Sequence, residues 1–190
     1  VILNTAQDHK RAFDGDIGPN TGGMGAYSPT PLSTDNILVK TKSTIIEPTL
    51  KAMRDAGHPF VGFLYVGLMI VDGEPFVIEF NVRMGDPETQ VVLPLLESSL
   101  FELLWHATHG KIKDSEVKIS SKTAVSVVLA ANGYPGSYSN GMEISGLETD
   151  SLVFHAGTKK LNDKMVTCGG RVLNVVGFGD DLKSAIDDAY

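Results

Sequence analysis

Three polar side chains recur at every second position in an otherwise apolar stretch, residues 76–83. They are Glu79, Asn81 and Arg83. Because successive side chains of a strand point to opposite faces, these three would share one face, and the other would carry Phe76, Ile78, Phe80 and Val82. A carboxylate and an amide oxygen two residues apart suit a hard cation such as Mg²⁺, which prefers oxygen ligands. The planar fork of Arg83 could bind a phosphate or a carboxylate bidentately.

The same alternation has a simpler interpretation. Antiparallel sheets often keep one face in water, so a solvated edge strand would also carry polar residues at alternate positions. The alternation alone is compatible with both interpretations.

A second group of polar residues follows directly, at residues 86–89 with the sequence Asp-Pro-Glu-Thr. An Asp at the N-cap, a proline in the first turn and an acid nearby are favoured at any helix start, so capping would explain the segment. The functional alternative places Asp86 beside a bound ammonium or hydroxyl group, with Pro87 opening a helix whose amides face an anion.

The glycine-rich loop at residues 21–25 is the third candidate. Its residues, Thr21, Gly22, Gly23, Met24 and Gly25, permit unusual backbone angles and could present several N–H groups to a phosphate. Glycine loops are also plain turns, and a glycine pattern alone fits many folds.

Two histidines and the single cysteine carry weaker signals. His106 and His109 lie three apart near the end of a leucine-rich segment, where the helix dipole favours them without any metal. We expect surface or packing roles for both. Cys168 has no nucleophile-activating neighbour in the sequence, so we expect inert packing there.

Local signals predict the elements that hold these residues. Ser33, Thr34 or Asp35 would cap a helix over residues 38–53, which Pro48 should kink or split in two and Gly57 closes. Apolar runs at 61–71 and 75–83 flank Asp72-Gly73, which predicts an antiparallel hairpin. A helical region follows from residue 86 to about Gly110. The predicted helices could cover the apolar face of the hairpin.

A polar stretch over residues 111–121 predicts a domain boundary. We therefore expect residues 1–112 to form one domain and residues 113–190 a small mixed domain with strands at 124–131, 152–155 and 172–176 and a last helix from Asp181. Residues 1–27 are polar and rich in turn-forming residues and are expected to be loop-rich. The fold class is α/β (α+β), with an antiparallel sheet and flanking helices.

Composition narrows the functional classes. The chain is 42% hydrophobic and 21% charged, an ordinary globular mixture. With a net charge of -7 and scattered Lys and Arg, it offers no track of phosphate contacts, so we expect no nucleic-acid partner. No apolar run reaches the roughly 20 residues of a membrane helix, so we expect no membrane partner. A free Cys168 favours a reducing, cytoplasmic compartment.

Several longer segments resemble one enzyme family. They are QDHKR (7–11), DGDIGPNTGGMGAYSP (14–29), GFLYVGLM (62–69), IEFNVRMGDPETQ (78–90), ANGYPG (131–136), VFHAGTK (153–159) and GGRVL (169–173). In this order they resemble the phosphoribosylamine-glycine ligases, ATP-grasp enzymes of purine biosynthesis. The resemblance covers essentially the whole chain.

The resemblance implies an activity and its site residues. ATP, glycine and 5-phosphoribosylamine would be the substrates, and the product would be glycinamide ribonucleotide, made through glycyl phosphate. Glu79 and Asn81 match ligands of Mg²⁺ or Mn²⁺. The segment with Arg83, Gly85, Asp86 and Pro87 would surround the acyl phosphate and substrates, with Arg83 and Asp86 as catalytic residues, and loop 21–25 would lie near the phosphoribosyl end.

The resemblance also indicates that part of the enzyme is absent from the sequence. The chain matches the carboxyl-terminal part of the ATP-grasp unit and a following domain, so the expected partner is a missing amino-terminal half that carries the lid and the adenine hinge. We expect the 190 residues alone to lack useful turnover. A non-catalytic nucleotide- or phosphoribosyl-binding remnant, and one piece of a split or multifunctional enzyme, remain alternatives.

Overall fold

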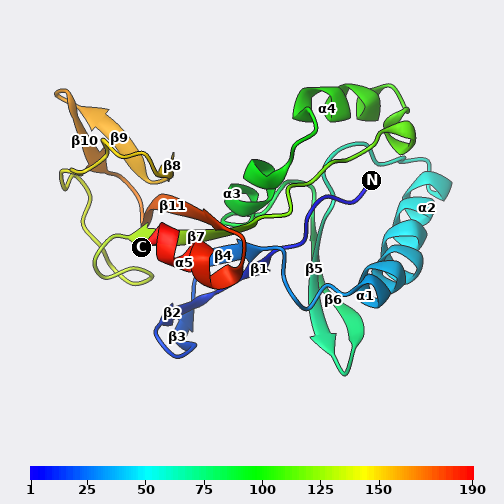
Figure 1. Cartoon of the computed structure of the whole chain (residues 1–190), viewed down its shortest axis with the longest axis horizontal. Coiled ribbons are helices and arrows are strands. Elements are labelled where there is room, and N and C mark those ends of the chain that lie inside the picture. The colour runs from blue at the N-terminus through cyan, green and yellow to red at the C-terminus, as the bar shows by residue number, and fades with distance from the viewer. The chain divides into compact units, whose positions relative to one another are not determined.

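The computed structural model describes all 190 residues, which form two compact units (Figure 1). The first unit contains residues 1–3, 30–85 and 96–118, and the second contains residues 4–29, 86–95 and 119–190. No helix is both long and apolar enough to cross a membrane. Strands in every sheet pair antiparallel, which confirms the expected fold class.

The first unit begins with the predicted long helix, which is divided as expected. It consists of α1 (Asp35–Lys40), a π-helical segment (Thr41–Ile46) and α2 (Glu47–Asp55). The hydroxyl of Thr34 accepts a hydrogen bond from the Ile37 amide at 3.4 Å and caps α1. Pro48 stands in the first turn of α2, where the missing N–H is tolerated. Gly57 follows the end of α2 with φ +82°, as a C-terminal glycine does.

The predicted hairpin is formed by β5 (Tyr65–Val71) and β6 (Glu74–Asn81). Asp72 and Gly73 join them with φ values of 52° and 74°, the positive angles that a tight hairpin turn needs. The pairing shifts between Gly67 and Leu68, because Gly67 lies opposite Glu79 whereas Leu68 lies opposite Val77. Ile78 is therefore the extra residue of a β-bulge.

The bulge changes which side chains share a face of β6, so the predicted alternation over residues 76–83 is only partly right. Beyond Ile78 the alternation is out of step, so Phe76 shares the face of Glu79 and Asn81, and Val77 shares the face of Phe80. The predicted helices also cover the hairpin only in part: α1 packs against β6, yet Phe80, on the face opposite Glu79, is 42% exposed and α2 has no buried residue. The last helix of this unit, α4 (Leu100–Thr108), is capped by Ser99.

The second unit is built on a five-stranded sheet with strand order β1-β4-β7-β11-β8. Its strands are β1 (Gln7–Asp8), β4 (Gly25–Ser28), β7 (Thr123–Ala130), β11 (Arg171–Gly179) and β8 (Leu152–His155). Two small hairpins, β2 (Arg11–Phe13) with β3 (Ile17–Asn20) and β9 (Thr158–Leu161) with β10 (Lys164–Thr167), complete the unit.

Helices cover both faces of this sheet. On one face Val91, in α3 (Thr89–Val92), and Leu95, in the following 3-10 turn, pack on Ala26, Ala124 and Val176. On the other face α5 (Leu182–Ala189) packs Ala185 and Ala189 against Val125. Gly177 allows this close approach, because a Cβ there would lie 2.3 Å from the backbone nitrogen of Ala189. Asp181 caps α5 as predicted, with a reciprocal bond to Ser184.

The compact units are not the consecutive segments 1–112 and 113–190 that the sequence suggested. Strand β4 pairs with β7 at four successive positions, so residues from the start of the chain complete the sheet of its carboxyl-terminal part. The segment 1–27, expected to be loop-rich, also holds the short strands β1 to β4, which get their partners from distant sequence or short hairpins.

Candidate functional site

Glu79 and Asn81 share one face of β6, as the sequence predicted. Asn81 pairs with Tyr65, and Glu79 pairs with Gly67 on the neighbouring strand. A Cβ at Gly67 would lie 3.1 Å from Cγ of Glu79, so the glycine leaves room for the carboxylate to rest over β5. Glu79 is exposed and Asn81 is half-buried.

These two side chains fit an oxygen-liganded cation. Neither is engaged in a hydrogen bond or ion pair within the chain, so the carboxylate and the amide oxygen remain available to a ligand. Both are held on a hydrogen-bonded strand two residues apart, which limits the entropy lost on binding. The donor set is the kind that Mg²⁺ or Mn²⁺ takes, with positions left for water and phosphate oxygens.

Arg83 lies beyond the strand that was expected to orient it. Strand β6 ends at Asn81, and Arg83 follows in a bend, so the two-residue alternation does not fix its direction. Its Nη1 donates a hydrogen bond to the carbonyl oxygen of Met84 at 3.0 Å, and the residue is exposed. A guanidinium with one local contact retains donors for an anionic ligand. Gly85 is buried and is the last residue of segment 30–85 of the first unit.

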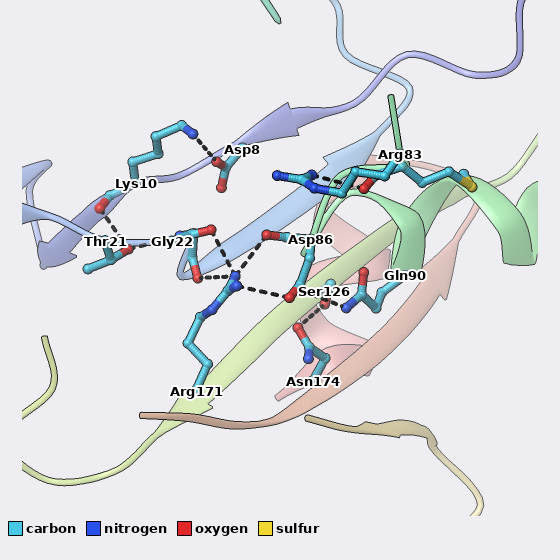
Figure 2. Close-up of polar contacts among 12 residues, drawn as sticks. Asp8, Lys10, Thr21, Gly22, Arg83, Asp86, Gln90, Ser126, Arg171 and Asn174 are labelled. Atoms are coloured by element: carbon cyan, nitrogen blue, oxygen red, sulfur yellow. Dashed lines mark hydrogen bonds and ion pairs between the residues drawn. The ribbon is translucent and has the colours of Figure 1, made fainter. Parts of the chain in front are cut away.

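In the second unit, Asp86 is held by an arginine that sequence reasoning did not single out (Figure 2). Nη2 of Arg171 lies 2.9 Å from Oδ2 of Asp86, and Nη1 donates to the Asp86 carbonyl at 2.8 Å. The second carboxylate oxygen, Oδ1, accepts from Nε2 of Gln90 at 2.8 Å. Asp86 therefore does not cap a helix: α3 begins at Thr89, and its N-cap residue is Glu88.

The glycine loop is fastened to the same arginine. Nη1 of Arg171 donates to the carbonyl of Gly22 at 2.8 Å and lies 3.4 Å from that of Gly23. On the other side, the amide of Gly22 donates to the hydroxyl of Tyr134 at 3.1 Å. The carbonyl group of Gly22 is thus bonded to Arg171 and its N–H group to Tyr134. These partners lie 149 and 112 residues away in the sequence.

The backbone amides of the loop are not arranged as an anion nest. Thr21 and Met24 donate to the carbonyls of Lys10 and His9, both at 2.7 Å. Gly22 donates to Tyr134, and Gly23 donates to the hydroxyl of Thr21 at 3.0 Å. All four N–H groups donate hydrogen bonds within the chain. A ligand would therefore find no free backbone donors at these four positions.

Gly23 is the point where the loop packs against its neighbours. Its φ is +116°, and a Cβ would lie 2.4 Å from Cδ of Pro87 and 2.7 Å from Oδ1 of Asp8. Pro87 is fully buried. The predicted substrate-binding residues Gly23 and Pro87 are thus in close contact, and only a glycine fits between Pro87 and Asp8.

Asp8 is an unexpected buried carboxyl group next to this loop. Its side chain is only 8% exposed, and Oδ1 has no hydrogen-bond partner. Burial, reinforced by the negative charge of Glu88, raises the pKa of Asp8 to about 6. Lys10, 3.3 Å from Oδ2, acts in the opposite direction but does not cancel the effect.

The structure groups the candidate residues into two sets. Glu79, Asn81, Arg83 and Gly85 belong to the first unit, and residues 21–25 belong with Asp86 and Pro87 in the second. Sequence reasoning missed Asp8, Tyr134 and Arg171 as site residues. Their only signal was their presence in the family-like segments 7–11, 131–136 and 169–173.

The histidines and the cysteine stand apart from these sets. Nδ1 of His106 lies 2.7 Å from Oγ of Ser115, and His109 stacks on Trp105 at 4.1 Å between ring centroids. Cys168 is an exposed free thiol, so the expectation that it packs inside was wrong. It follows the last residue of β10, where the chain turns toward Gly169 and Gly170.

Family models match two segments of the chain. Residues 1–89 match the ATP-grasp (A) domain of phosphoribosylglycinamide synthetase, and residues 124–190 match the C domain of the same enzyme.

Individual relatives agree. A phosphoribosylamine-glycine ligase of Leptospira interrogans is 52% identical over 193 residues, covering 100% of this chain and 45% of the relative. The trifunctional purine biosynthetic protein adenosine-3 of Gallus gallus is 49% identical over 97% of this chain and 19% of its own length. The crystal structure of a phosphoribosylamine-glycine ligase from Thermotoga maritima superposes with a TM-score of 0.91 at 40% identity, over 100% of this chain and 47% of that one. The chain thus spans about half the length of the single-function relatives it matches.

Proposed function

The chain belongs to the phosphoribosylglycinamide synthetase family, and from this we propose that it supplies part of the active site of an ATP-dependent ligase joining glycine to 5-phosphoribosylamine. The observation that carries the proposal is the ordered match of two models of one enzyme, at 1–89 and 124–190. The geometry of β6 supports it, because Glu79 and Asn81 present oxygen ligands on one face.

In the proposed reaction, the glycine carboxylate attacks the γ-phosphoryl group of ATP and forms glycyl phosphate and ADP. The amine of 5-phosphoribosylamine then displaces phosphate and forms the amide bond of glycinamide ribonucleotide. A Mg²⁺ or Mn²⁺ ion held by Glu79 and Asn81 would neutralise charge on the transferring phosphoryl group.

The other residues would bind and orient the reactants. Arg83, exposed and with only one local hydrogen bond, would direct its remaining donors to a phosphoryl or acyl phosphate oxygen. Asp86, held by Arg171, would accept a hydrogen bond from a substrate ammonium or hydroxyl group. Residues 21–25, with Pro87, would contact the phosphoribosyl end of the substrate.

We propose that turnover requires sequence beyond these 190 residues. Phosphoryl transfer depends on positioning in a closed site that excludes water, and the single-function relatives are about twice as long as this chain. The match to a trifunctional protein also favours a multifunctional parent as a second possibility. A non-catalytic remnant is less well supported, since Glu79 and Asn81 are both present and share one strand face.

The test uses the complete ligase and measures glycine-dependent ADP release together with Mn²⁺ binding by electron paramagnetic resonance. Glu79→Gln and Asn81→Ala should each weaken Mn²⁺ binding at least tenfold and abolish most turnover. Glu74→Gln is the matched control, because Glu74 lies on the same strand and its carboxylate forms an ion pair with Lys40. Unchanged Mn²⁺ binding in both site variants would refute the ligand assignment, and absence of glycine-dependent ADP release in the unmodified ligase would refute the proposed function.

A further inference from the structure

Arg171 connects three parts of the second unit that are far apart in sequence. It begins β11, and its guanidinium contacts the loop at Gly22 and both the backbone and the carboxylate of Asp86. The Arg171 side chain is 22% exposed and that of Asp86 is 50% exposed, so the arginine end of these bonds is partly shielded from water. Charge-assisted hydrogen bonds in such surroundings are stronger than those of an exposed ion pair.

The surroundings of the Arg171 side chain suit its planar guanidinium group. A Cβ at Gly22 would lie 3.0 Å from Cζ of Arg171, so the missing side chain is what lets the guanidinium lie against the loop. From there Nη1 reaches two carbonyl oxygens, of Gly22 and Asp86, at 2.8 Å, while Nη2 reaches the carboxylate. A lysine ammonium is a point charge and cannot span these acceptors in a fixed plane.

The contact between Arg171 and Gly22 matters because the backbone amides of the loop are already hydrogen-bonded. Because the N–H groups of residues 21–24 are bonded inside the chain, the loop offers a ligand no free backbone donor at these four positions, and the shape of the loop decides how a ligand fits against it. Arg171 sets that shape at Gly22 and fixes Asp86 at the same time. Gln90 occupies the other carboxylate oxygen, so Asp86 has one defined orientation.

We propose that Arg171 is a positioning residue for substrate binding: it holds the glycine loop and Asp86 in one fixed arrangement without touching substrate itself. This rests on the proposed function, which places the glycine loop near the phosphoribosyl end of the substrate and Asp86 beside a substrate ammonium or hydroxyl group. The residue comes from the segment matched by the C-domain model, and the groups it holds come from the A-domain segment. The carboxyl-terminal segment therefore contributes to the site by orienting it.

The experiment compares Arg171→Lys and Arg171→Met in the complete ligase, with Arg54→Lys and Arg54→Met as controls at an exposed position of α2. Hydrogen exchange of the peptide spanning residues 21–25 reports the loop, and steady-state kinetics report the site. We expect both Arg171 variants to exchange at least tenfold faster in this peptide and to raise the KM for 5-phosphoribosylamine at least tenfold. The KM for ATP should change less than threefold, and the Arg54 variants should behave like the unmodified enzyme.

A double-mutant cycle with Asp86→Asn separates positioning from direct contact. If Arg171 acts through Asp86 as well as the loop, the double variant should lose less kcat/KM than the product of the two single losses, because only the contact with Gly22 remains to be lost once Asp86 is neutralised. Raised KM with unchanged exchange of residues 21–25, or independent losses that multiply in the cycle, would mean that Arg171 binds substrate directly and would overturn the proposal. Equal losses toward ATP and 5-phosphoribosylamine would overturn it as well. An unmodified enzyme without activity would instead count against the proposed function.

Discussion

Replacing Asp8 with asparagine should remove a pH-dependent contribution to stability. The carboxyl is buried with one oxygen unpartnered, and its pKa is raised from 3.8 to about 6. The folded chain therefore binds a proton more tightly than the unfolded chain does. The corresponding stability is fully present below pH 3.8 and is lost as the pH rises through about 6.

The magnitude follows from the two pKa values. Moving from 3.8 to about 6 corresponds to about 3 kcal/mol between the acidic and the alkaline limits. About 1.4 kcal/mol of this should appear between pH 8 and pH 5, where the folded state takes up the proton and the unfolded state does not. The amide introduced by Asp8→Asn cannot titrate, so this variant should gain stability relative to the original chain as the pH rises from 5 to 8.

The assay is urea unfolding of the 190-residue chain at several pH values, followed by far-ultraviolet circular dichroism. Asp150→Asn serves as the control, since Asp150 is exposed in the same unit. Glu88→Gln should reduce the pH dependence, because the charge of Glu88 contributes to the raised pKa of Asp8. Parallel stability curves for the original chain and Asp8→Asn across pH 5 to 8 would refute the reasoning.

Three further predictions concern single positions. Arg83→Lys in the complete ligase should lower kcat at least tenfold although the charge is kept, since an ammonium cannot form a bidentate fork; near-normal steady-state rates would make Arg83 a surface residue. Gly67→Ala should weaken Mn²⁺ binding severalfold with little change in the thermal midpoint, because the added Cβ would press on Cγ of Glu79; unchanged binding would show that the carboxylate adjusts freely. Asp181→Ala should lower the thermal midpoint through loss of the α5 cap. The pKa of Asp181 is lowered by its bonds to Ser184, so this loss should be present at neutral pH and shrink as the pH falls below about 4; a difference independent of pH would contradict it.

Elements with strong local signals could be predicted from the sequence. The turn at Asp72-Gly73, the cap at Thr34 and the start of α5 at Asp181 each depend on residues within a few positions of one another. The same is true of the shared face of Glu79 and Asn81, because alternation holds between them without interruption. Local rules were sufficient there since the partners are local.

The features that sequence reasoning missed depend on distant partners. Strand β4 is only four residues long and is stabilised by pairing with β7, about 100 positions away, so its own residues look like loop. The bulge at Ile78 depends on how β5 and β6 pair and leaves no mark in either strand alone. Arg171 was visible only as part of a motif, and no spacing rule connects it with Gly22 or Asp86.

The glycine loop shows most directly how tertiary contacts change the meaning of a motif. From sequence, Gly22 and Gly23 suggested free amides for a phosphate, but their N–H groups are bonded to Tyr134 and Thr21. The absence of side chains is used instead for packing: Gly22 admits the plane of Arg171, and Gly23 fits between Pro87 and Asp8. A substitution at either glycine would therefore displace a neighbouring group even with no ligand bound. The loop and the carboxylate at Asp86 form one connected structure, so specificity for a substrate here should depend on the second unit as a whole.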